Sequence, residues 1–135
     1  AMIPKIEKLV GDLNGKRIGI LGLSFKPETD DMRESPAIDI IAQILKRGGS
    51  IKAYDPVAME ESRHYIDGIE YAADEYDAID GADALVILTE WNQFRALDLD
   101  RVKELLKSPK IADLRNIYEP KDMRELGFEY VGVGR

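Results

Sequence analysis

A polar loop with two cations, Lys26 and Arg33, follows the first strongly apolar run of the chain. The run covers residues 18–23 and has the composition of a buried strand. The loop, FKPETDDMRESPA, also holds four acidic residues and leads through Ser35 and Pro36 into a helix-like pattern. Ser at the N-cap and Pro at the first helical position are typical of a helix start. A strand that opens into a charged loop and then a helix is a common place for an anionic ligand in an α/β sheet.

Two further apolar runs, residues 84–88 and 111–113, also end in side chains that suit a ligand. These side chains are Thr89, Glu90 and Trp91 after the first run, and Arg115 and Asn116 after the second. Because the carboxyl ends of parallel strands meet at one edge of a sheet, we expect the three cations and the tryptophan to converge there. Arg can bind a phosphate through two hydrogen bonds and Lys supplies a point charge, so the edge could hold a nucleotide diphosphate.

The two cations of the first loop also have simpler interpretations. Lys26 can be solvated, although its place directly after a buried strand favours a ligand role. Arg33 can pair with an acid of its own loop, Asp30, Asp31 or Glu34, and only order the chain.

The later residues have alternatives too. Trp91 is favoured as a packing residue over a stacking platform. Arg115 can neutralise Glu119 or cap the end of a strand.

Asp55 stands where a dinucleotide-binding fold places the acid that binds a ribose, but the sequence favours a turn. Gly19 and Gly22 do not continue into G-x-G-x-x-G, since Phe25 stands at the third position. Pro56 directly after Asp55 is typical of a strand stop. The chain therefore has the pattern of a dinucleotide-binding domain without its phosphate-binding loop.

Composition excludes several classes of protein. The 135 residues suffice for one domain, and the net charge of −7 disfavours a general nucleic-acid or membrane partner. The chain has no cysteine, and its one histidine, His64, is expected on a solvated helix. No thiolate nucleophile, no Ser-His triad of the usual kind and no metal site built on Cys or several His are therefore expected. No apolar run is long enough for a membrane span, and the cytoplasm is the default location.

Apolar periodicity predicts alternating strands and helices. The expected strands cover residues 17–23, 51–54, 69–72 (a weak edge strand), 84–88, 111–113 and 128–133. The expected helices cover residues 3–13, 36–47, 58–64, 75–79, 99–106 and 121–126. This alternation predicts an α/β fold: a doubly wound, mostly parallel sheet in a Rossmann-like three-layer sandwich.

Four ordered motifs resemble one enzyme family. The stretch GILGLSFKPETDDMRESPA, with YDP, TEW and DLRN after it, resembles the C-terminal, UDP-binding domain of the UDP-glucose/GDP-mannose dehydrogenase family. The resemblance implies that residues 1–14 are a helix from the connection to a missing central domain and that residues 15–135 are the UDP-binding domain. The runs TEWNQFRALDLDR and GFEYVGVGR are most similar to the UDP-glucose 6-dehydrogenase branch, which oxidises UDP-glucose to UDP-glucuronate with NAD, a step of nucleotide-sugar metabolism that serves polysaccharide biosynthesis.

The resemblance also implies roles for particular residues. Phe25, Lys26 and Arg115 match the family's substrate-binding residues, with Lys26 on the UDP moiety, and Arg33 matches a residue that reaches NAD. Leu114 departs from the glycine that many members have before the matching arginine, and a bulkier residue there can shift the Arg115 backbone.

In the family, the catalytic cysteine, the catalytic lysine and most NAD contacts lie in domains outside this sequence. The resemblance therefore implies a UDP-sugar partner, NAD bound mainly elsewhere, a homo-oligomeric parent enzyme and no activity of this chain alone. The UDP-N-acetylmannosamine and GDP-mannose branches remain alternatives, as do a stand-alone nucleotide-binding regulatory domain and an assembly module with a purely structural loop.

Overall fold

A single parallel sheet of six strands forms the centre of the molecule. The computed structural model describes residues 2–134. Its strands are β1 (Arg17–Leu21), β2 (Ser50–Tyr54), β3 (Glu70–Tyr71), β4 (Ala84–Ile87), β5 (Lys110–Asp113) and β6 (Glu129–Gly132). They lie in the order β3-β2-β1-β4-β5-β6, and every neighbouring pair is parallel. The predicted doubly wound α/β fold is thereby confirmed, and β3 is the edge strand that its weak pattern predicted.

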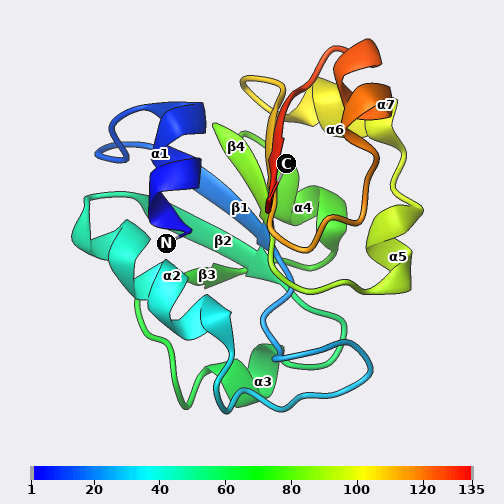
Figure 1. Cartoon of the computed structure of the whole chain (residues 1–135). Coiled ribbons are helices and arrows are strands. Elements are labelled where there is room, and N and C mark those ends of the chain that lie inside the picture. The colour runs from blue at the N-terminus through cyan, green and yellow to red at the C-terminus, as the bar shows by residue number, and fades with distance from the viewer. Residues whose placement is uncertain (1, 135) are drawn as a thin grey trace.

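Helices cover both faces of this sheet (Figure 1). The helices are α1 (Ile3–Val10), α2 (Pro36–Lys46), α3 (Met59–Ser62), α4 (Glu75–Ile79), α5 (Asn92–Arg95), α6 (Leu99–Leu105) and α7 (Pro120–Glu125). The apolar side chains of α1 and α2 pack in one core cluster, and those of α4, α5, α6 and α7 pack in a second. Three layers result, with the sheet between two layers of helices.

The central strands are apolar throughout because both of their faces are buried. In β1, Ile18 and Ile20 join the cluster beneath α1 and α2, whereas Leu21 joins the opposite cluster. In β4, Val86 and Ile87 divide in the same way. Alternation of side chains along a strand places successive residues on opposite faces, so a central strand needs a continuous apolar run.

The first helix closes the domain by contacting its last strand. Ile6 and Leu9 of α1 are buried in the same cluster as the sheet, and α1 packs against β5 and β6. The Lys5 ammonium donates a hydrogen bond to the carbonyl oxygen of Gly132 at 3.1 Å. Residues at the two ends of the chain thus meet.

Some boundaries differ from those that periodicity predicted. α1 ends at Val10, because Gly11 follows in a left-handed conformation with φ of 78°, although Leu13 is still fully buried. β1 ends at Leu21, where Gly22 takes a φ of 97°. The helix α5 was not predicted, since four residues are too few to show helical periodicity.

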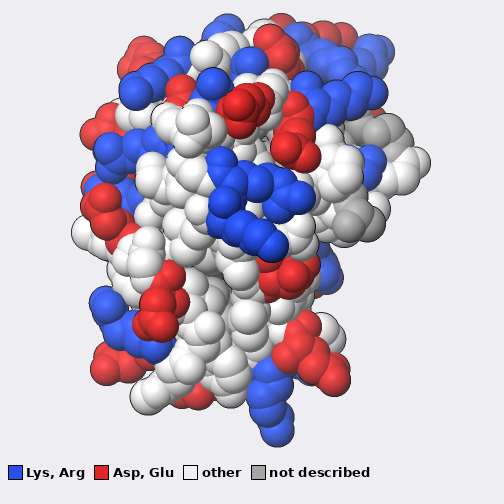
Figure 2. Space-filling view, turned by 90° about the vertical axis from the view of Figure 1, so that its left-hand side faces the viewer, with Lys and Arg blue, Asp and Glu red and all other residues white. Residues whose placement is uncertain are grey.

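The face that carries α1 and α2 has mixed charges. Lys and Arg side chains gather near the middle of this face and Asp and Glu side chains lie around them (Figure 2). One close pair on this face joins Arg47 of the α2 end to Glu7 of α1, with 3.8 Å between Nε and a carboxylate oxygen. Within residues 2–134, none of the helices has the length and apolar composition that crossing a bilayer requires.

Ser35 begins α2 as the sequence predicted, and its removal should be costly. Its hydroxyl oxygen accepts from the Ala37 amide at 3.2 Å and donates to the Leu23 carbonyl at 2.6 Å, in a buried position. We expect Ser35→Ala to lower the free energy of unfolding by about 1–3 kcal/mol, because it leaves two buried backbone groups without partners. Denaturant unfolding measures this loss.

The matched control is Ser50→Ala. Ser50 is exposed at the start of β2 and its hydroxyl has no hydrogen bond to a residue within 2–134, so the change should stay within about 0.5 kcal/mol. Equal losses in the two variants would contradict the capping role.

Candidate functional site

The loops that leave β2, β1, β4 and β5 lie side by side at the carboxyl edge of the sheet. The strand order reverses between β1 and β4, which is the switch point at which doubly wound sheets bind ligands. In Figure 1 this edge is the lower part of the molecule, with the loop after β1 and α3 at the bottom. The sequence predicted ligand-binding residues in three of these loops.

Asp55 at the end of β2 fastens that strand to the loop after β1. Its Oδ2 accepts from the Leu23 and Ser24 amides at 2.8 and 3.1 Å, and from the Ser24 hydroxyl at 3.3 Å. Its Oδ1 accepts from the Val57 and Ala58 amides at 2.9 and 2.8 Å, which closes the predicted turn. The carboxylate is fully buried and both oxygens are occupied, so it is not free to bind a ribose.

Thr89 at the end of β4 is fastened to the same loop. Its hydroxyl donates to the Ser24 carbonyl oxygen at 2.9 Å, and the side chain is fully buried. Gly22 permits this close approach, because a Cβ there would lie 2.5 Å from Thr89. Thr89 therefore joins β4 to β1 and does not face solvent.

Glu90 and Arg115 form an ion pair between the ends of β4 and β5. The Nε of Arg115 donates to Oε2 of Glu90 at 3.1 Å, and its Nη2 donates to both Oε1 and Oε2 at 2.8 Å. The side chains of Arg115 and Glu90 are 33% and 31% exposed, so about two-thirds of each is buried. Of the two alternatives for Arg115, a pair with Glu119 does not form. The contact with Glu90 was not predicted, although both residues were named as site residues.

Asp113 holds the backbone of the loop that carries Arg115. Its Oδ1 accepts from the Arg115 amide at 3.2 Å, and its Oδ2 accepts from the Tyr118 amide at 3.0 Å and the Tyr130 hydroxyl at 2.5 Å. Burial raises the pKa of the Tyr118 hydroxyl, and the nearby charge of Asp113 raises that pKa further. Sequence reasoning missed this network, since β6 supplies one of its members.

Leu114 is an anchor of the loop that carries Arg115. Its side chain is buried in the cluster beneath α1 and α2, and its amide donates to the Ile87 carbonyl at 3.0 Å. Asn116 then turns the chain with a φ of 55°, and its side-chain amide exchanges two hydrogen bonds of 2.9 Å with the Val133 backbone. The bulky residue thus anchors the loop, and Asn116 binds protein at the exposed rim.

Of the cations in the loop after β1, Arg33 is paired and Lys26 is not. Arg33 donates from Nε and Nη2 to the two oxygens of Asp31 at 3.1 and 3.2 Å, yet its side chain is 79% exposed. These hydrogen bonds lower the pKa of the Asp31 carboxyl. Lys26 is exposed, and its ammonium has no hydrogen bond or ion pair to a residue within 2–134. Phe25, which precedes it, is 43% exposed.

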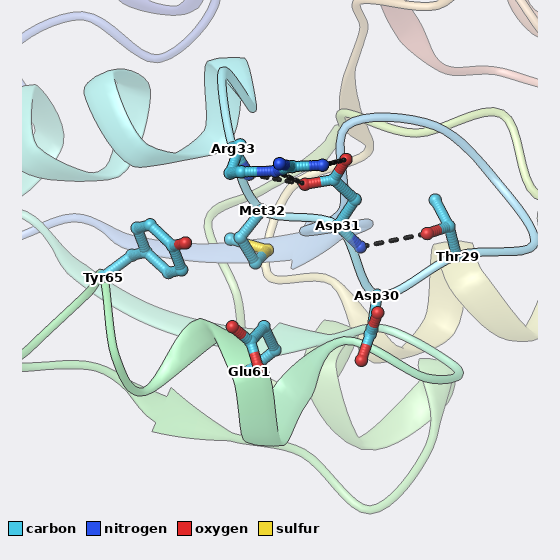
Figure 3. Close-up of a pocket in the computed structure, with 7 residues that line it drawn as sticks. All are labelled: Thr29, Asp30, Asp31, Met32, Arg33, Glu61 and Tyr65. Atoms are coloured by element: carbon cyan, nitrogen blue, oxygen red, sulfur yellow. Dashed lines mark hydrogen bonds and ion pairs between the residues drawn. The ribbon is translucent and has the colours of Figure 1, made fainter.

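Two open pockets flank this loop. The larger, of about 400 Å³, lies between the loop and α3 (Figure 3). It is lined by Thr29, Asp30, Asp31, Met32, Arg33, Glu61 and Tyr65. The second, of about 230 Å³, is lined by Phe25, Asp31, Arg33 and Glu34. Glu61 and Tyr65 were not predicted as pocket residues, since α3 is too short to show which face it turns inward.

Trp91 packs in the core. It is 5% exposed in the cluster with Phe94, and its Nε1 is buried without a partner among the described residues. Lys26, Thr89, Trp91 and Arg115 line neither pocket beside the loop. The predicted residues therefore share one edge of the sheet but do not form one cavity.

The doubly wound sheet makes this chain a Rossmann-like α/β domain, a fold that it shares with a domain of solved dehydrogenases. The chain belongs to the UDP-glucose/GDP-mannose dehydrogenase family: residues 19–120 match the model of that family's UDP binding domain.

Known proteins support this membership along most of the chain. A UDP-glucose 6-dehydrogenase of Rhizobium meliloti (strain 1021) is 50% identical over 125 residues, 93% of this chain and 29% of that protein. The structure of a UDP-glucose dehydrogenase from Pyrobaculum islandicum has a TM-score of 0.78 and 32% identity, over 97% of this chain and 28% of that one. The crystal structure of the NDP-N-acetyl-D-galactosaminuronic acid dehydrogenase of Methanosarcina mazei Go1 has a TM-score of 0.82 and 29% identity. The match covers 98% of this chain and 27% of that one. The chain spans less than a third of each.

Among the polar residues of this edge, Asp55 should be the one whose substitution lowers stability most. We expect Asp55→Asn to lower the free energy of unfolding by about 2–4 kcal/mol, because an amide nitrogen would face backbone donors that the carboxylate now satisfies. Denaturant unfolding checks this, with Asp67→Asn as the control. Asp67 is exposed and has no hydrogen bond within residues 2–134, so its replacement should leave stability unchanged. A loss below about 1 kcal/mol at Asp55 would show that the edge does not depend on its charge.

Proposed function

We propose that this chain is the UDP-sugar-binding domain of an NAD-dependent UDP-glucose 6-dehydrogenase, whose full-length form oxidises UDP-glucose to UDP-glucuronate. The observation that carries the proposal is the 50% identity to the Rhizobium meliloti UDP-glucose 6-dehydrogenase over 93% of the chain. Relatives that act on other nucleotide sugars keep a second reading open: the Methanosarcina mazei enzyme named above has 29% identity and the higher TM-score. The identity favours UDP-glucose.

In this proposal the carboxyl edge holds the nucleotide sugar. Phe25, Lys26 and Arg115 contact the substrate, and the residues after β4 and Asn116 shape the rim. Arg33 and Arg115 already form ion pairs with carboxylates, whereas the Lys26 ammonium forms no ion pair or hydrogen bond within residues 2–134 and only feels the charge of Asp31 at a distance. Lys26 therefore supplies a charge with no ion-pair partner for a diphosphate, and Arg115 supplies oriented donors.

The proposal gives this chain no chemical step of its own. The chain has no cysteine to act as a nucleophile, so the isolated domain should not oxidise UDP-glucose. NAD supplies the hydride acceptor when bound, and the residues here do not fit a complete NAD site, since Asp55 is buried and its oxygens are occupied. Arg33, exposed near the end of its loop just before α2, is the residue proposed to reach the cofactor held by other domains.

The same proposal covers the parent protein. We propose that α1 continues the connection from a central domain, and that the parent is a cytoplasmic homo-oligomer. A chain longer than this one, with two further domains before α1, is what the 29% coverage of the Rhizobium meliloti relative leads us to expect.

A titration with UDP tests the proposed site. We expect weak binding, with a dissociation constant on the order of 0.1–1 mM, because one domain supplies few contacts to offset the cost of immobilising the ligand. Amide NMR shifts should cluster at Phe25, Lys26, residues 89–91 and Arg115. Shifts confined to the amino ends of the strands, around Lys16 and Gly81, would refute the placement.

Two substitutions in the full-length enzyme separate the proposed roles. Lys26→Ala should weaken nucleotide-sugar binding and Arg33→Ala should weaken NAD binding, each by roughly ten- to a hundredfold, the cost of one charge-assisted contact of about 1.5–3 kcal/mol. Separate titrations with each ligand measure the losses.

Melting temperatures provide the check on structure. Both side chains are exposed, so neither substitution should unfold the protein. Lys121→Ala, at an exposed residue of α7, is the charge-matched control and should change neither affinity. Equal loss of both ligands together with a sharp fall in melting temperature would contradict the division of roles.

A further inference from the structure

We propose that Glu90 is a positioning residue for Arg115: it holds one edge of the guanidinium and leaves the other edge for a phosphate-bearing ligand. The inference rests on the proposed function, since the ligand is the nucleotide diphosphate of a UDP sugar at this edge. An acid beside an anion site is normally expected to repel the ligand. The inference assigns Glu90 the opposite effect, because it holds the arginine that binds the ligand.

The geometry of the pair carries the argument. Nε and Nη2 of Arg115 face the two oxygens of Glu90, and Nη1 donates to no residue within 2–134. A guanidinium presents its donors in a rigid plane, so fixing the Nε edge also fixes the direction of Nη1. Glu90 thereby selects one orientation of a long side chain that would otherwise sample many.

Glu90 is itself held from two sides. Its backbone carbonyl accepts from Nη1 of Arg95 at 3.2 Å, and Arg95 also bonds the side chain of Asn92 at 3.1 Å. The residue before it, Thr89, is fastened to Ser24 at 2.9 Å. The backbone from which the carboxylate extends is thus held in place, and the carboxylate connects the end of β4 to the Arg115 loop.

The pair should persist when a ligand binds. Both side chains are about two-thirds buried, so a phosphate that displaced Glu90 would leave a partly desolvated carboxylate without its partner. A ligand that accepts from Nη1 leaves the pair intact and adds a charge-assisted hydrogen bond. We therefore expect the ligand to share Arg115 with Glu90 and not to displace Glu90 from it.

The Arg33–Asp31 pair shows the contrast. There the two residues lie two positions apart in one loop, and the arginine side chain is 79% exposed. Such a pair is screened by water and does little to fix a side chain. Glu90 and Arg115 instead join loops that are 25 residues apart in the sequence.

The test is a UDP titration of this chain carrying Glu90→Gln. Repulsion by Glu90 predicts tighter binding when the charge is removed, and positioning predicts weaker binding. We expect about a three- to tenfold loss of UDP affinity in Glu90→Gln, and less than a twofold change when the same substitution is added to Arg115→Ala. Glu90→Asp keeps the charge but shortens the reach, and should also weaken binding.

An NMR signal reports the orientation without ligand. The Nε–Hε resonance of Arg115 should be sharp and shifted in the wild-type chain, and should move toward the position of a free arginine in Glu90→Gln and Glu90→Asp. Glu104→Gln, at an exposed acid of α6, removes the same charge and should leave both the affinity and this resonance unchanged.

The outcomes are separable. Tighter or unchanged UDP binding in Glu90→Gln overturns the positioning role while the proposed site stands, and so does a loss of equal size in the Arg115→Ala background. If Glu90→Gln does not fold, the same criteria apply to Glu90→Asp. If the wild-type chain shows no UDP shifts at the carboxyl edge, the proposed function fails and this inference fails with it.

Discussion

The buried carboxylate of Asp55 fixes where the functional edge begins. Five hydrogen bonds converge on its two oxygens, three from the loop after β1 and two from its own turn. A buried carboxylate is tolerated only when such donors replace its water, so the two loops must adopt this arrangement together. The direction in which residues 25–35 leave the sheet follows from that requirement.

A continuous series of polar contacts extends from Asp55 across four strand ends. Ser24 connects it to Thr89, the next residue is Glu90, and Glu90 holds Arg115. At the end of β5, Asp113 plays the same part as Asp55, because its carboxylate also accepts hydrogen bonds from the backbone of the loop that follows its strand. Loops are usually the mobile parts of an α/β domain, and here side chains bind each loop to its neighbour. The edge is thus ordered by contacts within the protein itself.

Local signals in the sequence were sufficient for the fold. Ser35 and Pro36 start α2 as predicted, the residues 75–79 form α4 with the predicted bounds, and the weak pattern around Glu70 lies at the sheet edge. These features depend on neighbours within a few positions, where capping, periodicity and β-propensity act.

The site was predictable only in part, because its contacts are long-range. The sequence indicated which edge carries Lys26 and Arg115. It did not indicate that Glu90, 25 residues away, forms an ion pair with one edge of the Arg115 guanidinium. Trp91 was named as a lining residue with packing as the favoured alternative, and it lies in the core. A side chain's partners depend on which loops the topology brings together, and a single sequence does not display that.

The contact between α1 and the last strand has a consequence for how the chain folds. Lys5 and Gly132 are 127 residues apart, so the contact of α1 with β5 and β6 joins parts of the domain that are far apart in the sequence. Contacts of such high sequence separation slow folding, because the intervening chain loses conformational entropy before the contacts can stabilise it. Loss of β6 would therefore uncover part of the apolar face of α1, although the two elements stand far apart in the sequence.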